Sequence, residues 1–232
     1  DLLSVSKVIR SGRIVQGEVV EKFEKKVAKY IGVDGAVATN TGTSALHLSL
    51  LAIGIKEGDY VAMPSFVCTA LLNAVRYVGA HPTLVDIDPE TYNIDIRDLK
   101  KRVKKSTKAI ILPHLFGLPA DIDEIVSLGI PVIEDCAQAI GAVYKGRKVG
   151  SFGKLSCFSF YATKVLSTGE GGMVVSDSKS LLKKIRDFRD YDNKKNYTVR
   201  YNYKMTDIQA AMGIAQLKKL HSLLLKRANI AK

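Results

Sequence analysis

The segment Phe158–Gly172, FSFYATKVLSTGEGG, places one lysine, Lys164, between an aromatic strand-like run and a group of glycines. Most lysines lie on protein surfaces, and that interpretation suits most of the others in this chain. Lys164 differs because glycines allow sharp turns and close approach of the backbone to a ligand. A lysine kept from water loses its proton more easily and becomes a nucleophile for a carbonyl carbon. The segment therefore predicts Schiff-base chemistry at Lys164.

A second candidate is the acid near the end of the apolar run IPVIEDC, residues 130–136. An unpaired buried carboxylate is costly, so Asp135 needs a partner or water. It could cap a helix, or it could hold a proton on the ring nitrogen of a ligand, with Gln138 three residues further on. Glu134 is the poorer candidate, because neighbouring residues of a strand point to opposite faces of the sheet.

A third candidate is the segment ATNTGTSAL, residues 38–46. Gly42, Thr43 and Ser44 open a predicted helix there and offer backbone N–H groups, two hydroxyls and a positive helix end to a phosphate. Serine and threonine also favour helix starts for purely structural reasons. On these residues alone, an ordinary helix cap is the better interpretation.

The elements that must position these residues alternate along the chain. Helices are expected at residues 19–32, 43–54, 71–79, 95–104 and 120–129. Strands are expected at residues 35–39, 60–65, 82–88, 108–114 and 130–136. This alternation through short loops predicts an α/β fold with a mainly parallel sheet flanked by helices on both faces. The strands are continuous apolar runs, as strands covered on both faces should be.

The pattern changes after Asp135. Strand-like segments are expected at residues 142–150, 155–162 and 172–176, and helices at 180–191 and 205–232. Ligands of open parallel sheets bind beyond the carboxyl ends of the strands, which makes the three candidate segments informative together. No repeat or linker interrupts the order, so residues 1–232 are predicted to form one domain.

Composition narrows the class of protein. With 47% hydrophobic and 25% charged residues, the chain has an ordinary globular composition. No apolar run reaches the roughly 18–20 residues needed to cross a bilayer, and the start lacks the apolar core of a signal peptide, so we expect no membrane segment and a cytoplasmic location. Cys68, Cys136 and Cys157 are far apart, which favours neither a disulfide framework nor a zinc site.

The surplus of positive charge, 35 basic against 23 acidic residues, raises the question of a nucleic-acid partner. The excess lies in short clusters such as EKFEKKVAK and DLKKRVKK, each on an expected amphipathic helix. Solvated helix faces explain these clusters, and no base-reading motif accompanies them. Nucleic-acid binding is therefore the weaker interpretation.

A phosphate cradle, then a ring-pairing aspartate, then a Schiff-base lysine is the order expected of a pyridoxal phosphate (PLP) enzyme. The sequence resembles the sugar aminotransferases of the DegT/DnrJ/EryC/StrS family, which have the aspartate aminotransferase type of fold. The resemblance covers nearly the whole chain, and EDCAQAIGA and FSFYATK are its most specific segments. Its other segments are SGRIVQG, TGTSALHLSL, GDYVAMPSF, LVDIDPETYNID, HLFGLPADID and YNYKMTDIQAAMGIAQL.

The resemblance implies a role for each candidate. Lys164 matches the lysine that forms the Schiff base with the cofactor and then moves protons. Asp135 matches the acid that pairs with the pyridine nitrogen, and Gln138 matches a glutamine near the ring and its phenolic oxygen. The positions that match phosphate-binding residues are Thr43, Ser44 and Ser159.

The resemblance also implies a homodimer. Asn202, in YNYKMTD, matches an asparagine that reaches the phosphate of a neighbouring subunit, and Tyr203 or Lys204 would take that role if the local register differs. Many relatives stack an aromatic side chain on the cofactor in the segment matching SFVCTAL. This chain has Cys68 there, with Phe66 nearby, and the stacking residue is left open.

We therefore expect a PLP-dependent aminotransferase that converts a keto-sugar, linked to a nucleotide, to an amino-sugar with an amino acid, glutamate, as donor. Residues 1–232 would form its PLP-binding large domain with an N-terminal helical segment, and the smaller C-terminal domain of relatives would be absent or truncated. The alternative is a truncated PLP-binding, regulatory or DNA-binding protein without transaminase activity. A sugar dehydratase is disfavoured, because such relatives replace the lysine by histidine where this chain has Lys164.

Overall fold

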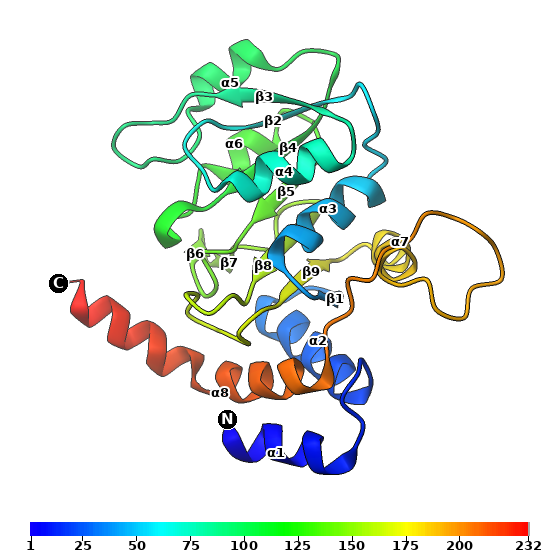
Figure 1. The fold of residues 1–232 in the computed structure, drawn as a ribbon. Helices are drawn as coiled ribbons and strands as arrows, with labels where there is room; N and C mark the ends of the chain where they lie inside the picture. Colours follow the sequence, from blue (N-terminus) through cyan, green and yellow to red (C-terminus); the bar gives the residue numbers. More distant parts are fainter. Residues whose placement is uncertain (232) are drawn as a thin grey trace.

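The computed structural model describes residues 1–231 (Figure 1). Its helices are α1 Leu2–Ser11, α2 Glu18–Ile31, α3 Gly42–Ala52, α4 Thr69–Tyr77, α5 Ile96–Arg102, α6 Ile122–Val126, α7 Lys179–Arg189 and α8 Asp207–Ile230, with a short 3-10 helix η1 at Leu115–Gly117. Its strands are β1 Gly35–Thr39, β2 Tyr60–Pro64, β3 His81–Val85, β4 Thr107–Pro113, β5 Val132–Asp135, β6 Val143–Tyr144, β7 Arg147–Lys148, β8 Leu155–Ser159 and β9 Gly172–Ser176.

Seven strands form one sheet in the order β1-β9-β8-β5-β4-β2-β3. β9 runs antiparallel to both of its neighbours, and all other pairs in this sheet are parallel. The prediction of an α/β fold with a mainly parallel sheet is confirmed. The expected strand at 142–150 is instead a hairpin of β6 and β7, because Lys145 and Gly146 both take positive φ at its turn.

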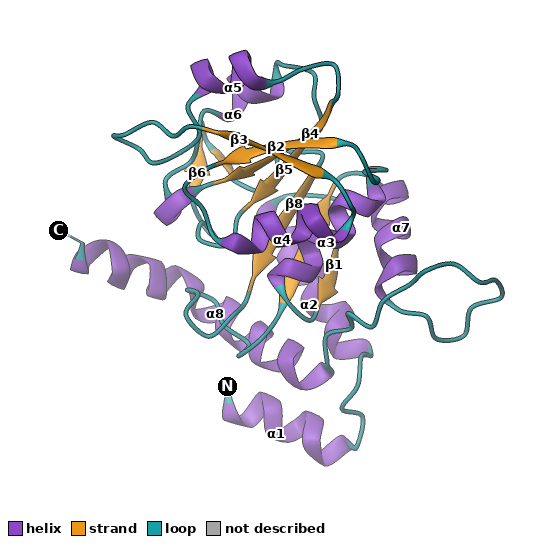
Figure 2. Ribbon diagram, turned by 45° about the horizontal axis from the view of Figure 1, so that its top comes forward, coloured by secondary structure: helices purple, strands orange, loops and turns teal. Residues whose placement is uncertain are grey.

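Helices cover both faces of the sheet, as predicted (Figure 2). Side chains of α2, α5, α6 and α8 pack in one core with strand residues such as Ala36 and Ala38. Side chains of α3, α4 and α7 pack in a second core with Val37 from the opposite face of the same strand. Because successive strand residues alternate between these cores, the inner strands β2, β4, β5, β8 and β9 are buried on both sides. The helices thereby fix the direction in which each strand end points.

Helix α1 lies against α8 on the outside of this body (Figure 1). The start of α8 is tied to the start of α2 by Asp207, whose carboxylate accepts hydrogen bonds from the N–H groups of Gly17, Val19 and Val20. Among the helices of residues 1–231, none combines the length and the apolarity that crossing a bilayer requires.

Candidate active site

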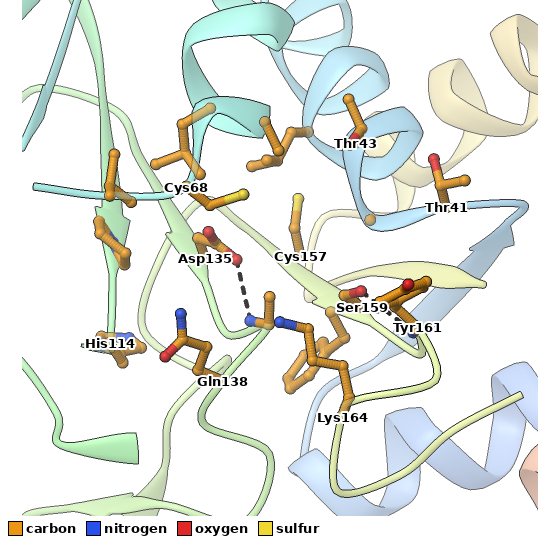
Figure 3. Close-up of a pocket in the computed structure, with 18 of the residues that line it drawn as sticks. Thr41, Thr43, Cys68, His114, Asp135, Gln138, Cys157, Ser159, Tyr161 and Lys164 are labelled. Atoms are coloured by element: carbon orange, nitrogen blue, oxygen red, sulfur yellow. Dashed lines mark hydrogen bonds between the residues drawn. The ribbon is translucent and has the colours of Figure 1, made fainter. Parts of the chain in front are cut away.

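A cavity of about 270 Å³ opens at the carboxyl ends of the parallel strands (Figure 3). Its walls come from the segments that follow β1, β2, β4, β5 and β8. The predicted site residues that line it are Thr43, Asp135, Gln138, Ser159 and Lys164. Residues separated by more than a hundred positions therefore meet in one place, where ligands of open α/β sheets bind.

Asp135 lies at the end of β5 with 8% of its surface exposed. The N–H of Ala137 donates to its Oδ1 at 3.0 Å, and within residues 1–231 no hydrogen bond is made to Oδ2. Burial raises the pKa of this carboxyl, while the Ala137 N–H and the nearby His114 and Lys164 oppose that shift. The Lys164 side chain points into the cavity toward Asp135 (Figure 3). The acid therefore has one oxygen left for a cationic partner.

Glu134 points to the other face of β5 and does not line the cavity, as strand alternation predicted. It is fully buried, and both of its oxygens accept hydrogen bonds. Its five donors are His114 Nε2, Gly150 N, Phe152 N, Gly153 N and Ser156 Oγ. Burial alone would raise the pKa of Glu134, but the bonds from His114 and the backbone hold it below the ordinary value. This carboxylate anchors the loop before β8.

His114, Glu134 and Cys136 bring ligand-type atoms within 4.8 Å of one another. The Glu134 oxygens are already bonded to other donors. Burial, reinforced by the Glu134 and Asp135 carboxylates, raises the pKa of the Cys136 thiol well above its usual range. Since a metal binds the thiolate, a protonated thiol beside a saturated carboxylate does not favour a metal site.

The start of α3 forms another wall of the cavity. Thr41 is the N-cap, and its Oγ1 accepts a hydrogen bond from Ser44 N at 3.0 Å. The N–H groups of Gly42 and Thr43 donate to no other group of residues 1–231. A Cβ on Gly42 would lie 2.9 Å from the Cβ of Ser159, so only glycine lets α3 approach the end of β8 this closely. Two free N–H groups and the Ser159 hydroxyl thus share one corner.

Ser44 lies behind this corner rather than on the cavity wall. Its hydroxyl donates to Asn40 Oδ1 at 2.7 Å and lies 2.9 Å from Thr41 Oγ1. Both contacts of the Ser44 hydroxyl are therefore with the residues just before α3. Its predicted phosphate contact stays a prediction.

The loop that carries Lys164 folds back on itself between β8 and β9. Lys164 N donates to Tyr161 O, and Thr168 N donates to Phe160 O, each at 2.9 Å. Phe160 is fully buried against Phe23 of α2, with ring centroids 5.2 Å apart. A buried aromatic side chain and a compact loop therefore hold Lys164 at the cavity.

Asn202 is exposed and lies outside the cavity of its own chain. Its neighbour Tyr203 is bonded through both its backbone and its side chain. Asn40 N donates to Tyr203 O at 2.9 Å, and the Tyr203 hydroxyl lies 3.2 Å from His47 Nδ1. Lys204 pairs with Asp192 at 2.5 Å. Of these three, Asn202 has the side chain left to reach another subunit.

Two positions that the sequence left open are now placed. Cys68 lines the cavity, whereas Phe66 does not line it and packs against Tyr92 with centroids 5.7 Å apart. Sequence reasoning missed several wall residues: Thr41, His114, Cys157, Tyr161 and Glu170. Thr41 could have been found from the sequence, because threonine is a preferred N-cap residue and Thr41 directly precedes the predicted helix start at Gly42. The others reach the cavity only through the tertiary fold.

The whole sequence matches the model of one protein family. The model of the DegT/DnrJ/EryC1/StrS aminotransferase family matches residues 1–232. The chain belongs to this family. Pyridoxal phosphate is the cofactor of the family, and the sheet with its flanking helices is the type I fold of such enzymes, which confirms the resemblance.

Two relatives and one solved structure are similar to most of the chain. GDP-perosamine synthase of Escherichia coli O157:H7 is 42% identical over 93% of this chain and 62% of its own length. GDP-perosamine synthase of Caulobacter vibrioides is 44% identical over 92% of this chain and 60% of its own length. The PLP form of protein Spr1654 from Streptococcus pneumoniae superposes with a TM-score of 0.94 at 28% identity, covering 99% of this chain and 66% of that one. The chain thus spans less than two thirds of these relatives.

Proposed function

We propose that residues 1–232 are the PLP-binding large domain, with α1 and α2 as its N-terminal helical segment, of a nucleotide-sugar aminotransferase. The reaction converts a keto-sugar to an amino-sugar with an amino acid, glutamate, as donor. One observation carries the proposal: a single cavity joins Lys164, the half-satisfied Asp135 and two free N–H groups at the start of α3. Membership of the family and the names of its relatives support the substrate class.

The cavity residues suit a phosphorylated ring that carries an aldehyde. The phosphate would be held by the N–H groups of Gly42 and Thr43 and by the Ser159 hydroxyl, since a helix N-terminus favours anions. The open oxygen of Asp135 would pair with the protonated ring nitrogen. Gln138 Oε1 already accepts a hydrogen bond from Phe116 N at 3.0 Å, which leaves its amide N–H groups to face the ring.

When bound, PLP supplies an electron sink for transfer of an amino group. The chain's own contributions follow from where its groups lie. Asp135 would keep a positive charge on the ring nitrogen, because its carboxylate is otherwise a buried, half-satisfied anion. Lys164, held at the cavity by its compact loop, would attach the cofactor and would move protons between a carbon of the bound substrate and a carbon of the cofactor.

The assembly and location form part of the same proposal. A homodimer would let Asn202, which is exposed and outside its own cavity, reach the phosphate of the neighbouring subunit. The nucleotide-sugar and the amino acid would be the small-molecule partners. A cytoplasmic location suits an enzyme that acts on nucleotide-linked sugars.

The test is to trap the cofactor on its lysine. The purified chain, loaded with PLP and reduced with borohydride, should carry the cofactor on Lys164 in peptide mass spectra, with visible absorbance before reduction. Lys164→Ala should lose both signals, whereas Lys154→Ala, at an exposed lysine before β8, should keep them. Retention of a borohydride-fixed cofactor in Lys164→Ala would refute the assignment.

A further inference from the structure

Three exposed aromatic side chains stand in a row beside the mouth of the cavity. Phe66 lies 5.7 Å from Tyr92, and Tyr92 lies 6.4 Å from Phe116, between ring centroids. Their exposed fractions are 50%, 46% and 71%. Water-exposed rings that gather in this way, rather than singly, indicate a binding surface.

The row is continuous with the cavity wall. Phe66 directly precedes Val67 and Cys68, which line the cavity, and Phe116 follows the lining residue Leu115. Phe116 N also donates to the lining residue Gln138. A ligand that leaves the cavity on this side would therefore pass over the three rings.

The row is built by the backbone rather than left over from folding. Tyr92 and Phe116 both adopt positive φ, 58° and 54°, which is uncommon for aromatic residues and costs conformational energy. The side chain of Asn93, which is buried, joins the two loops, since Nδ2 donates to Leu118 O and Oδ1 accepts from Leu115 N, each at 3.1 Å. Strained residues held by buried hydrogen bonds are typical of ligand sites.

The volume of the cavity indicates which part of the substrate would lie on the aromatic row. The cavity of about 270 Å³ lies just below the roughly 300–1,000 Å³ typical of pockets that enclose a whole drug-sized ligand. It has room for the groups that react, whereas a nucleotide-linked sugar also brings a diphosphate and a planar base. The base must then lie beyond the mouth of the cavity.

We propose that Phe66, Tyr92 and Phe116, whose ring planes are inclined by 44° and 80° between neighbours, form a platform whose ring faces and edges hold the base of the nucleotide-linked substrate. The inference rests on the proposed function and adds the part of the surface that holds the nucleotide. Stacking accepts any base, because every base has a π-face, so UDP and GDP should both bind.

The experiment measures binding of UDP, GDP and inorganic pyrophosphate by calorimetry to the full chain loaded with PLP. Tyr92→Leu and Phe116→Leu keep an apolar side chain but remove the ring, and each should weaken UDP and GDP binding on the order of tenfold. Pyrophosphate, which has no base, should bind these variants as it binds the unchanged chain. The matched control is Tyr197→Leu, at a tyrosine that is 94% exposed and does not line the cavity.

Phe66→Leu carries the test if the strained positions do not tolerate substitution, because Phe66 has no positive φ. Photo-crosslinking with 5-iodo-UDP, mapped by peptide mass spectrometry, should label the 66, 92 or 116 peptides. Unchanged nucleotide affinity in the variants overturns the platform, and so does a change confined to sedimentation mass, which would assign the row to a second copy of the chain. Borohydride trapping on Lys164 in the same samples reports the proposed function separately, so one proposal can fail without the other.

Discussion

Glu134 and Asp135 are neighbours on β5, are both buried and face opposite sides of the sheet. Five donors surround Glu134, and although burial raises its pKa, the bonds from His114, Gly150 and Gly153 bring that pKa below the ordinary value. Asp135 accepts one backbone hydrogen bond, and burial raises its pKa. Burial is therefore common to both acids, while the supply of donors differs.

The contrast separates an anchor from a site. A saturated carboxylate stabilises the fold, because removing it would leave several buried donors without an acceptor. An unsaturated one is tolerated where a ligand completes it. The predictions below test whether Glu134 stabilises the fold while Asp135 serves a ligand.

The largest effect is expected on chemistry. Asp135→Asn keeps the size of the side chain but cannot hold the positive charge on the cofactor ring, so proton removal from the amino donor should slow by about 10²–10⁴-fold. Single-turnover absorbance of the PLP-loaded chain measures this rate, with Glu134→Gln as the comparison where it folds. A rate for Asp135→Asn equal to that of the unchanged protein would make both acids structural.

The second effect is on stability. Glu134→Gln replaces the acceptor of five donors with an amide, and the free energy of unfolding should fall by about 3 kcal/mol. Urea denaturation followed by circular dichroism provides the measurement. The pH dependence has a defined sign: because the folded-state pKa is lowered, the contribution of Glu134 is present above its ordinary pKa of 4.5 and is lost as the pH falls through the lowered value. A variant as stable as the parent would remove the anchor from the comparison.

His47 extends the comparison to a buried base with few partners. Three tyrosine rings, Tyr77, Tyr201 and Tyr203, surround its imidazole at 4.8–5.9 Å, and Nε2 has no hydrogen-bond partner within the described residues. Burial lowers the pKa of His47 from 6.5 to about 4.

Stability should therefore decline by about 1–2 kcal/mol as the pH falls from 6.5 toward 4, since the unfolded chain takes up the proton first. His47→Phe should flatten that decline in urea titrations at a series of pH values. An unchanged slope in the variant would assign the decline to other groups.

The smallest effect has the opposite sign to that of Glu134→Gln. In the cofactor-free chain, Asp135→Asn should raise the free energy of unfolding at neutral pH by on the order of 1 kcal/mol, since a half-satisfied buried anion is removed. Because the folded-state pKa of Asp135 is raised, the unchanged protein loses stability as the pH rises from 3.8 through the raised value, and the variant should not. Thermal melts of both proteins without PLP at pH 4 and pH 7 supply the test. If the variant and the unchanged protein have equal melting temperatures at both pH values, the prediction is wrong.

The sequence predicted the parts of this site that depend on local pattern. Asp135 at a strand end, the helix start at Gly42 and the glycine-flanked Lys164 follow from periodicity and turn chemistry. The residues alone predicted Schiff-base chemistry at Lys164 and left the other roles open, the family resemblance assigned those roles, and all of them stay proposals. The donors of Glu134 come from His114 and from a loop near Gly150, which no local pattern connects. The positive φ of Tyr92 and Phe116 could not be predicted, because aromatic residues seldom adopt it.

The order of strands was also beyond local reasoning. β9 enters the sheet between β1 and β8 and reverses the direction there, because its pairing depends on residues far along the chain. The approach is close enough that a Cβ on Gly172 would lie 2.2 Å from Thr41 O. A glycine in a strand indicates that another backbone can approach closely there, but the sequence does not show which segment approaches.

The pairing of β1 with β9 has a consequence for synthesis of the protein. β1 lies at the sheet edge, and its partner strand ends at Ser176, so the first strand waits for more than a hundred further residues to be translated. Contacts of such long sequence separation form late, after loop-closure entropy has been overcome. A nascent chain that stops before Ser176 would hold Gly42, Thr43 and Ser159 without the strand that pairs with both β1 and β8. Its apolar β1 would stay exposed to chaperones and to other chains until β9 leaves the ribosome.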